Sequence, residues 1–301
     1  MTYHIPVLLH ECIQGLKIQP DGVFVDVTFG GGGHSKAILN KLTTGRLIAF
    51  DQDTDAEQNL IDDARFTLVK QNFRFMKNNL KLMQCLPVDG ILADLGISSH
   101  QIDFAERGFS TRFDAPLDMR MNRDQKLSAY EVINHNSEEQ LKNIFKHYGE
   151  LPDAGKIARH ICNVRSDGSV KTTGRLCEIL KPFRPTNKIN KFLAQVFQAI
   201  RIEVNDELGS LKLLLTQAKE VLKPGGRLVI ISYHSLEDKL VKQFIKHGKF
   251  EGEAEKDLYG NVKLPFIAVN RKPITASEQE LERNSRARSA SLRIAERTEN
   301  I

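Results

Sequence analysis

Five short apolar runs, rich in β-branched residues, dominate the hydrophobic pattern of the chain. Runs of this length are typical of strands that are buried on both faces of a parallel sheet. Helix-compatible stretches at residues 35–42 and 54–64 separate the first three. Strands that alternate with helices predict right-handed βαβ units and an open, Rossmann-like α/β sheet. The five runs cover residues 23–27, 47–50, 66–69, 90–93 and 228–231.

The spacing of these runs predicts an inserted domain. The fourth run starts at residue 90 and the fifth only at residue 228, which is too far for a structureless loop in a compact domain. Much of the intervening stretch has helical periodicity, and a helix over residues 202–222 should return the chain to the sheet. We therefore expect a sheet domain of residues 1–103 and 203–301, and a small helical domain of residues 104–202.

Two further segments near the end of the chain have strand character. Residues 265–270 form one, and residues 289–296 alternate between apolar and polar positions. Such alternation predicts a half-exposed hairpin at the edge of the sheet.

Composition narrows the class of protein. No window approaches the length of apolar sequence that spans a membrane, and the N-terminal apolar run is too short for a signal peptide, so we expect a cytoplasmic protein without a membrane partner. The four cysteines are scattered without metal-ligand spacing, so we expect no metal site.

The positive charge of the chain is concentrated in one segment. The net charge is +5, but residues 153–201 hold ten Lys/Arg against three Asp/Glu. A basic segment on a near-neutral body favours a polyanionic partner bound through its phosphates, although a solvated helical surface would look the same.

The polar residues that follow the apolar runs predict a ligand site, because ligands of open parallel sheets bind beyond the carboxyl ends of the strands. Four consecutive glycines, Gly30 to Gly33, follow the first run and precede a helix. The loop lacks the Lys-Ser/Thr ending of a P-loop and the last glycine of a dinucleotide fingerprint. It therefore indicates a nucleotide-like ligand without a pyrophosphate cradle.

Each of the next three runs also ends in a residue suited to such a ligand. Asp51 can accept hydrogen bonds from both hydroxyls of a ribose, while Asp53 caps the following helix. Phe73 can pack against an adenine ring, and Asp94 closes the fourth run. The turn at residues 222–228, Leu-Lys-Pro-Gly-Gly-Arg-Leu, looks like the one common in class I methyltransferases.

At this level of detail the chain resembles the RsmH (MraW) family of bacterial small-subunit ribosomal RNA methyltransferases. The resemblance covers nearly the whole chain, although Thr54, Ser285 and residues 191–196 depart from the family pattern. The shared strings lie at residues 4–9, 26–35, 89–99, 107–110, 116–121, 148–150, 197–202, 231–238 and 286–290.

The resemblance implies a class I methyltransferase sheet with an inserted helical domain for substrate recognition. It also implies S-adenosylmethionine as cofactor, 16S rRNA in the small ribosomal subunit as partner, N4-methylation of a cytidine in the decoding region, and a homodimer. The cofactor contacts that it implies are Gly32, Gly33, His34, Asp51, Phe73, Asp94 and Gln101.

Asp118 and His234 are candidates for holding the target base. The alternative for Asp118 is an ion pair with Arg120 or Arg123. The alternative for His234 is an interface residue beside Ser235, which would cap the next helix. The arginines expected to contact RNA phosphates are Arg201, Arg286, Arg288 and Arg293.

Two other functions share part of this pattern. A nicotinamide-dependent dehydrogenase would have a similar glycine loop and Asp51, but its fingerprint is incomplete here. An RNA-binding assembly factor with a vestigial fold would not need the intact set of residues at the strand ends.

Overall fold

The computed structural model describes residues 6–254, 260 and 262–299, so His4 and Ile5 of the first family string lie outside the described residues. The chain divides into two compact units. The sheet unit comprises residues up to Gly96 and from Leu208 onward, and the helical unit comprises Ile97 to Glu207. The division thus falls a few residues away from the predicted boundaries at 103/104 and 202/203.

Seven strands form one sheet in the described part of the sheet unit, in the order β3-β2-β1-β4-β5-β7-β6. The first five pair in parallel, and β7 runs antiparallel to both β5 and β6. The Rossmann-like prediction is confirmed by this order, which reverses direction between β1 and β4. The strands are β1 (Val23–Asp26), β2 (Arg46–Phe50), β3 (Phe66–Val69), β4 (Val88–Asp94), β5 (Leu222–Ser232), β6 (Phe266–Ala268) and β7 (Ser291–Arg297).

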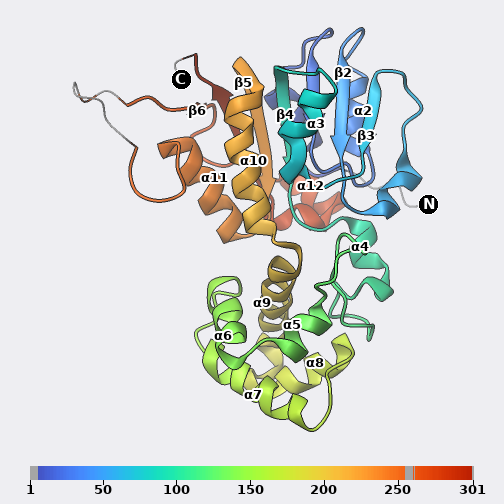
Figure 1. Cartoon of the computed structure of the whole chain (residues 1–301), viewed down its shortest axis with the longest axis vertical. Coiled ribbons are helices and arrows are strands. Elements are labelled where there is room, and N and C mark those ends of the chain that lie inside the picture. Colours follow the sequence, from blue (N-terminus) through green and yellow to red (C-terminus); the bar gives the residue numbers. More distant parts are fainter. Residues whose placement is uncertain (1–5, 255–259, 261, 300–301) are drawn as a thin grey trace. The chain divides into compact units, whose positions relative to one another are not determined.

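Helices cover both faces of the sheet because its central strands are apolar on both sides (Figure 1). On one face, α3 (Met76–Leu82), α10 (Glu207–Val221) and α11 (Ser235–His247) pack against β-strand residues such as Ile48 and Ile230. On the other face, α1 (Leu9–Leu16), α2 (Gly33–Leu39) and the segment after α12 (Glu278–Arg283) pack against residues such as Phe24 and Val229. Each face therefore has its own hydrophobic core.

The helical unit has a separate core. It contains α4 (Ser99–Asp103), α5 (Ala129–His135), α6 (Glu138–His147), α7 (Ala154–Ser166), α8 (Thr173–Leu180) and α9 (Thr186–Asn205). Ser128, Ser137 and Thr172 cap the N-termini of α5, α6 and α8 through their hydroxyl oxygens, which explains where these helices begin. No helix within the described ranges is both long and apolar enough to cross a membrane.

Three local predictions are wrong. The stretch 54–64 forms only a short 3-10 helix, Thr54–Asn59, and the acidic pair Asp62 and Asp63 would oppose the dipole at the end of a longer one. The predicted helix 202–222 is broken at Asp206, whose φ of 47° ends α9 and lets α10 begin at Glu207. Strand β7 is not half-exposed, because it lies between β5 and β6 and residues 292–295 are all buried.

Candidate functional site

The glycine loop begins at the carboxyl end of β1, where Asp26 is fully buried. One carboxylate oxygen of Asp26 accepts a 3.1 Å hydrogen bond from the backbone N–H of Thr28, and the other accepts a 2.7 Å bond from the hydroxyl of Ser35 in α2. Asp26 therefore joins the strand to the helix on both sides of the loop. Burial raises the pKa of this carboxyl, although these hydrogen bonds and His34 oppose the effect.

The four glycines of the loop have different structural roles. Gly30 and Gly32 have φ values of 49° and 73°, in the left-handed region that favours glycine. Gly33 is needed for packing, since a Cβ atom there would lie 2.3 Å from Cγ of Pro6. A Cβ atom at Gly31 would meet nothing within 4 Å. The backbone of the loop is therefore accessible to a ligand at residue 31. At residues 32 and 33 it is constrained by its φ value and by packing on Pro6.

Asp51 follows β2 and binds the glycine loop directly. Its Oδ2 accepts a 2.8 Å hydrogen bond from the N–H of Gly30, and its Oδ1 accepts a 2.9 Å bond from the N–H of Asp53. Burial raises the pKa of Asp51 to about 6, despite these two bonds. Asp53 caps the following 3-10 helix, as predicted, by accepting a hydrogen bond from the N–H of Asp55.

The end of β3 is tied to the end of β2 through side-chain amides. Asn72 donates a 2.8 Å hydrogen bond from Nδ2 to Oε1 of Gln52, and its own Oδ1 caps the 3-10 helix Phe73–Phe75. These bonds fix the backbone on either side of Phe73. The Phe73 ring is half-buried and contacts the core beneath α3 and α10, so part of its surface remains accessible.

Asp94, the last residue of β4, is hydrogen-bonded to residues that follow two other strands, β1 and β5. Its backbone N–H donates a 2.6 Å hydrogen bond to Oγ1 of Thr28, and its Oδ1 accepts a 2.7 Å bond from the hydroxyl of Tyr233, which follows β5. Burial raises the pKa of both Asp94 and Tyr233, and for Tyr233 the nearby carboxylate raises it further.

His34, in the first turn of α2, lies beside Asp94. Its Nε2 is 3.0 Å from the carbonyl oxygen of Val7, and because a carbonyl can only accept, Nε2 carries the proton. Its Nδ1 is 3.8 Å from Oδ2 of Asp94. The imidazole is thus oriented between the N-terminal segment and the end of β4.

The charge of this strand-end site is negative. Asp26, Asp51 and Asp94 are all partly or wholly withdrawn from water, and burial raises the pKa of each carboxyl. A cationic ligand would favour the ionised forms and offset part of their desolvation. The residues present therefore fit a ligand with a ribose and positive charge, and they provide no anion cradle for a pyrophosphate.

Gln101 belongs to the helical unit and is engaged within it. Its side-chain Oε1 accepts a 3.0 Å hydrogen bond from the N–H of Ser98, while its N–H donates to the Ser98 hydroxyl, which completes a capping box at α4. The side chain is buried. Among the predicted cofactor contacts, Gln101 is therefore the one that belongs to the helical unit.

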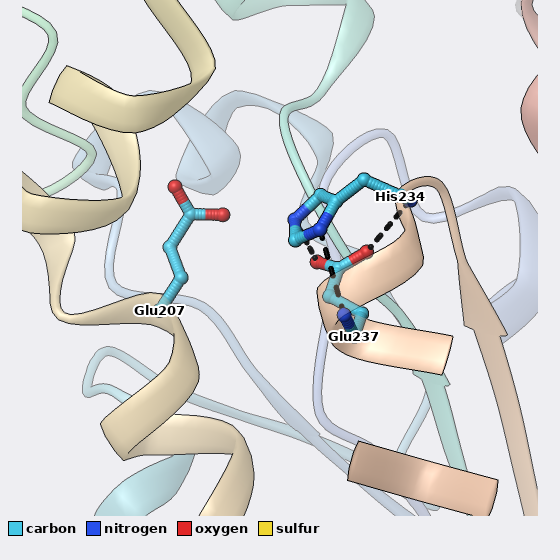
Figure 2. A group of neighbouring side chains, drawn as sticks. All are labelled: Glu207, His234 and Glu237. Carbon is cyan, nitrogen blue, oxygen red and sulfur yellow. Dashed lines mark hydrogen bonds and ion pairs between the residues drawn. The ribbon is translucent and has the colours of Figure 1, made fainter. Parts of the chain in front are cut away.

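His234 is the N-cap of α11 and pairs with Glu237 in the same first turn (Figure 2). Its Nδ1 accepts a hydrogen bond from the N–H of Glu237, and its Nε2 lies 3.2 Å from Oε1 of that residue. Glu237 in turn accepts a 2.9 Å bond from the N–H of Tyr233. His234 itself, rather than the predicted Ser235, is therefore the cap of α11. Its side chain has a structural place there, while its catalytic role stays a prediction.

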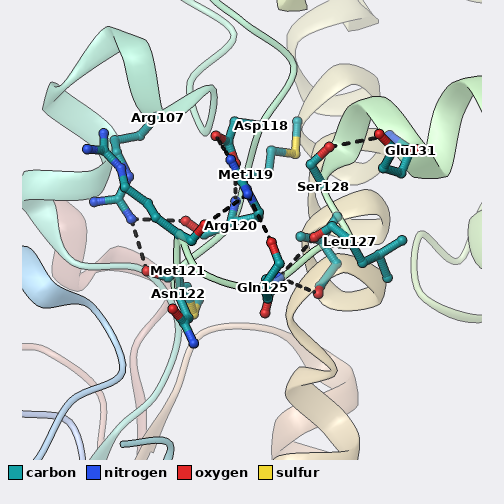
Figure 3. A network of polar contacts seen from close by, with 12 residues as sticks. Arg107, Asp118, Met119, Arg120, Met121, Asn122, Gln125, Leu127, Ser128 and Glu131 are labelled. Carbon is teal, nitrogen blue, oxygen red and sulfur yellow. Dashed lines mark hydrogen bonds and ion pairs between the residues drawn. The ribbon is translucent and has the colours of Figure 1, made fainter. Parts of the chain in front are cut away.

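Asp118 forms the ion pair that the sequence left open as an alternative. Both of its oxygens bind the guanidinium of Arg120, at 2.7 Å from Nε and 2.9 Å from Nη2 (Figure 3). The same contacts lower the pKa of Asp118 against the effect of burial. Arg107, fully buried, holds the adjoining loop through bonds from its Nη2 to the carbonyls of Arg120 and Met121.

The four arginines expected to contact RNA differ in exposure. Arg201 and Arg293 are largely buried, and their guanidinium groups bind Glu207 and Asp238 through two bonds each. Arg286 is half-buried and Arg288 is exposed, both in the 3-10 helix Ser285–Ser289. The basic segment 153–201 adds exposed lysines at Lys156, Lys171, Lys181, Lys188 and Lys191.

Sequence reasoning missed two parts of the strand-end site. Tyr233 follows β5 next to His234, and its position at a fifth strand end was the available signal. Asp26 and Ser35 also escaped notice, since an acid inside an apolar run and a serine inside a helix looked like ordinary structural residues. The predicted contacts of the sheet unit nevertheless lie at the ends of β1, β2, β3 and β4, as the sheet order requires.

Comparisons with known proteins support this architecture. Residues 1–298 match the model of the MraW methylase family. The chain is 57% identical, over 98% of each protein, to "Ribosomal RNA small subunit methyltransferase H" of Christiangramia forsetii. It is 56% identical to the protein of that name from Flavobacterium johnsoniae, over 99% of this chain and 98% of that one.

The solved structure of an rRNA methylase from Streptococcus thermophilus is 12% identical over 99% of each chain, with a TM-score of 0.40. The fold assignment does not depend on this likeness, because the strand order alone defines it.

Proposed function

Because the chain belongs to the MraW methylase family, we propose that it methylates N4 of a cytidine in the decoding region of 16S rRNA, within the small ribosomal subunit. The predicted family, the class I methyltransferase fold, the enzyme class and the cofactor S-adenosylmethionine are confirmed by this membership. The position of the methylated base and the state of the ribosomal substrate belong to the proposal.

The observation that supports the cofactor site best is the pair Asp51 and Asp94 on either side of the glycine loop. Asp51 would accept hydrogen bonds from the ribose hydroxyls, and Asp94, with His34, would hold the charged methionine moiety. Phe73 would pack against the adenine ring. The open backbone at Gly31 would let the ligand approach closely, and we keep the neighbouring Gly32 and Gly33 as proposed contacts. We also keep Gln101 as a proposed contact from the helical unit.

Bound S-adenosylmethionine supplies a methyl group that is already activated on a sulfonium, so the main task of the protein is positioning. The residues at the strand ends are held by hydrogen bonds within the protein, as the contacts of Asp51 with Gly30 and of Asp94 with Tyr233 show. Such preorganisation favours an in-line arrangement of donor and acceptor. The cytosine amine is a weak nucleophile, so hydrogen-bond acceptors near its N–H groups would assist.

For RNA binding we propose the exposed cations rather than the buried ones. Arg288 and the exposed lysines of the basic segment are available to phosphates, and Arg286 lies beside Arg288. Arg201 and Arg293 hold carboxylates in partly buried ion pairs, so we propose structural roles for them. Recognition of the substrate by the helical unit and a homodimeric state remain predictions from the family.

One experiment tests the proposed function directly. The protein would be incubated with methyl-labelled S-adenosylmethionine and small ribosomal subunits that lack the modification, and the rRNA would be digested to nucleosides. We expect label in N4-methylated cytidine from the decoding region. Label in another nucleoside, or none, would contradict the proposal.

A further inference from the structure

Residues 6–8 pack against the glycine loop and against His34, within the sheet unit. Pro6 lies on Gly33, where a Cβ atom would come within 2.3 Å of the proline Cγ. The carbonyl oxygen of Val7 is 3.0 Å from Nε2 of His34. We call this segment the N-terminal strap. It contacts two residues of the strand-end site, so whatever holds the strap also affects that site.

Leu8, the last residue of the strap, has a strained backbone. Its φ of 50° is rare for a residue with a side chain, and the side chain is fully buried. It precedes α1 without capping the helix through its side chain. Its N–H instead donates a 2.7 Å hydrogen bond to Oε1 of Glu280, 272 residues further along the chain. Strain of this kind persists only where the surroundings maintain it, and it is concentrated at ligand clamps and active sites.

Glu280 is well placed to maintain this conformation. It lies in α12 and is half-buried, whereas Glu278 and Glu282 of the same helix are exposed. A hydrogen bond from a backbone N–H to a carboxylate is charge-assisted and stronger than one between neutral groups. The bond therefore ties the strap to a helix from the other end of the chain. One explanation for it is purely structural, since it also fastens α12 beside the start of α1.

The strap also determines which nitrogen of His34 carries the proton. Because the Val7 carbonyl accepts from Nε2, the Nδ1 of a neutral imidazole has a lone pair, and Oδ2 of Asp94 lies 3.8 Å from it. These two acceptors cannot bond to each other, but both can accept from one cationic donor with several N–H groups. If the Val7 carbonyl were withdrawn, the proton could move to Nδ1 and bond to Asp94, and both acceptors would be lost to a ligand.

We infer that Glu280 is a positioning residue for the cofactor site. It binds the N–H of Leu8, keeps the adjoining Val7 carbonyl in place, and so holds His34 with its proton on Nε2. Nδ1 and Asp94 then remain acceptors for the positively charged methionine moiety of S-adenosylmethionine. This inference rests on the proposed function, which gives His34 and Asp94 that role. Glu280 acts through the strap and is not among the proposed cofactor contacts.

Calorimetric titration with S-adenosylmethionine tests the inference on binding. We expect Glu280→Ala to weaken the affinity roughly 10-fold, within the range for residues of one hydrogen-bond network, and to raise KM for the cofactor more than it lowers kcat. Glu282→Ala, at an exposed position of the same helix, should bind like the wild type. Glu280→Gln keeps an acceptor at the same place and should recover most of the affinity. Wild-type affinity in Glu280→Ala, or no recovery in Glu280→Gln, would overturn the inference.

The tautomer of His34 gives a measurement that needs no cofactor. We expect the ¹⁵N resonances of its imidazole, at about pH 8 where imidazoles are neutral, to show the proton on Nε2 in the wild type and in Glu282→Ala. In Glu280→Ala the population should shift toward Nδ1. An unchanged tautomer together with a lower affinity would leave Glu280 with a structural role alone. If Glu280→Ala is unstable, Glu280→Asp, which is shorter by one methylene, should give the same shift.

A double-mutant cycle separates this inference from the proposed function. If Glu280 acts through His34, then Glu280→Ala should weaken cofactor binding little further in a protein that already carries His34→Ala. Additive losses would overturn the inference. Wild-type affinity in His34→Ala alone would instead contradict the proposed cofactor contacts, on which the inference depends.

Discussion

The hydroxyl of Tyr233 donates a 2.7 Å hydrogen bond to Oδ1 of Asp94. This bond joins the residue after β5 to the last residue of β4, next to the strand at which the sheet order reverses. Because Tyr233 binds Oδ1 while Oδ2 lies 3.8 Å from Nδ1 of His34, we expect Oδ2 to be the oxygen that faces the proposed cofactor.

Replacing Tyr233 by Phe removes one hydroxyl from the strand-end site. The partly buried carboxylate of Asp94 then lacks its neutral donor, and a hydrogen bond to a charged group contributes about 1.5–3 kcal/mol. We expect the affinity for S-adenosylmethionine to fall roughly 10-fold to 100-fold in calorimetric titration. Tyr148→Phe, in the helical unit, is the control. Unchanged affinity for Tyr233→Phe would show that the bond does not orient Asp94 for the cofactor.

Cofactor binding should weaken as the pH falls through about 6. Burial raises the pKa of Asp51 to about 6 in the folded protein, so its carboxylate is ionised at pH 7.5 and largely protonated at pH 5. A protonated carboxyl accepts more weakly from ribose hydroxyls, and the bound ligand should release the proton. Titration at pH 5, 6 and 7.5 would check this. Asp51→Asn should bind weakly at all three values, and a wild-type affinity independent of pH would count against the assignment.

The same pKa shift affects stability with the opposite sign. The pKa of Asp51 is higher in the folded than in the unfolded chain, so the folded state binds more protons between about pH 4 and 6. The contribution of this group to stability therefore rises as the pH falls through that window and is lost as the pH rises above 6. Thermal melts without cofactor should show wild-type stability falling from pH 5 to 7.5 relative to Asp51→Asn, and an equal pH dependence in both proteins would contradict this.

Arg107→Ala should loosen the helical unit. The buried guanidinium binds the carbonyls of Arg120 and Met121, and both would lose a partner. We expect a loss of roughly 2–4 kcal/mol in the free energy of opening, measured by hydrogen exchange at buried amides of α5. Arg159→Ala, at an exposed position, should change it by no more than about 0.5 kcal/mol. Similar protection in both variants would show that the buried arginine is not needed.

Asp118→Asn distinguishes a structural from a catalytic role. Because both carboxylate oxygens bind Arg120, we expect most of the turnover to persist, with a modest decrease in stability of about 1 kcal/mol. Arg120→Gln should have a similar effect, as it breaks the same pair. Complete loss of turnover in Asp118→Asn alone, with unchanged cofactor affinity, would instead restore Asp118 as a catalytic residue.

RNA affinity should depend on salt through the exposed cations. We expect Arg288→Ala to weaken binding across sequences and to reduce the slope of log affinity against log salt by about one. Arg293→Ala should act differently, because it removes the partner of Asp238 and lowers the melting temperature. An Arg288→Ala slope equal to that of the wild type would exclude this contact.

Much of the sheet unit could be predicted because its signals are local. The apolar runs of β1 to β5 and the glycines after β1 define the order of strands and helices, and parallel strands place their carboxyl ends at one edge. The spacing between β4 and β5 likewise revealed an insertion.

The errors came from interactions between segments distant in the sequence. The alternation in residues 289–296 predicted a half-exposed hairpin at the edge of the sheet. Strands β6 and β7 do form this hairpin, but residues 292–295 of β7 are buried between β5 and β6. The helix predicted over residues 202–222 is interrupted at Asp206, where the backbone is left-handed. Nothing in the local sequence indicated this, because aspartate also occurs within helices. Tyr233 could not be recognised without knowing that β5 lies beside β4, and the pairs of Arg201 and Arg293 depend on the packing around them.

The packing of Pro6 on Gly33 makes the two positions dependent on each other. A methyl group at residue 33 would overlap the proline ring, so alanine there can be accommodated only if the ring is removed from residue 6. Relatives that carry a larger residue at one of these positions should therefore carry a smaller one at the other.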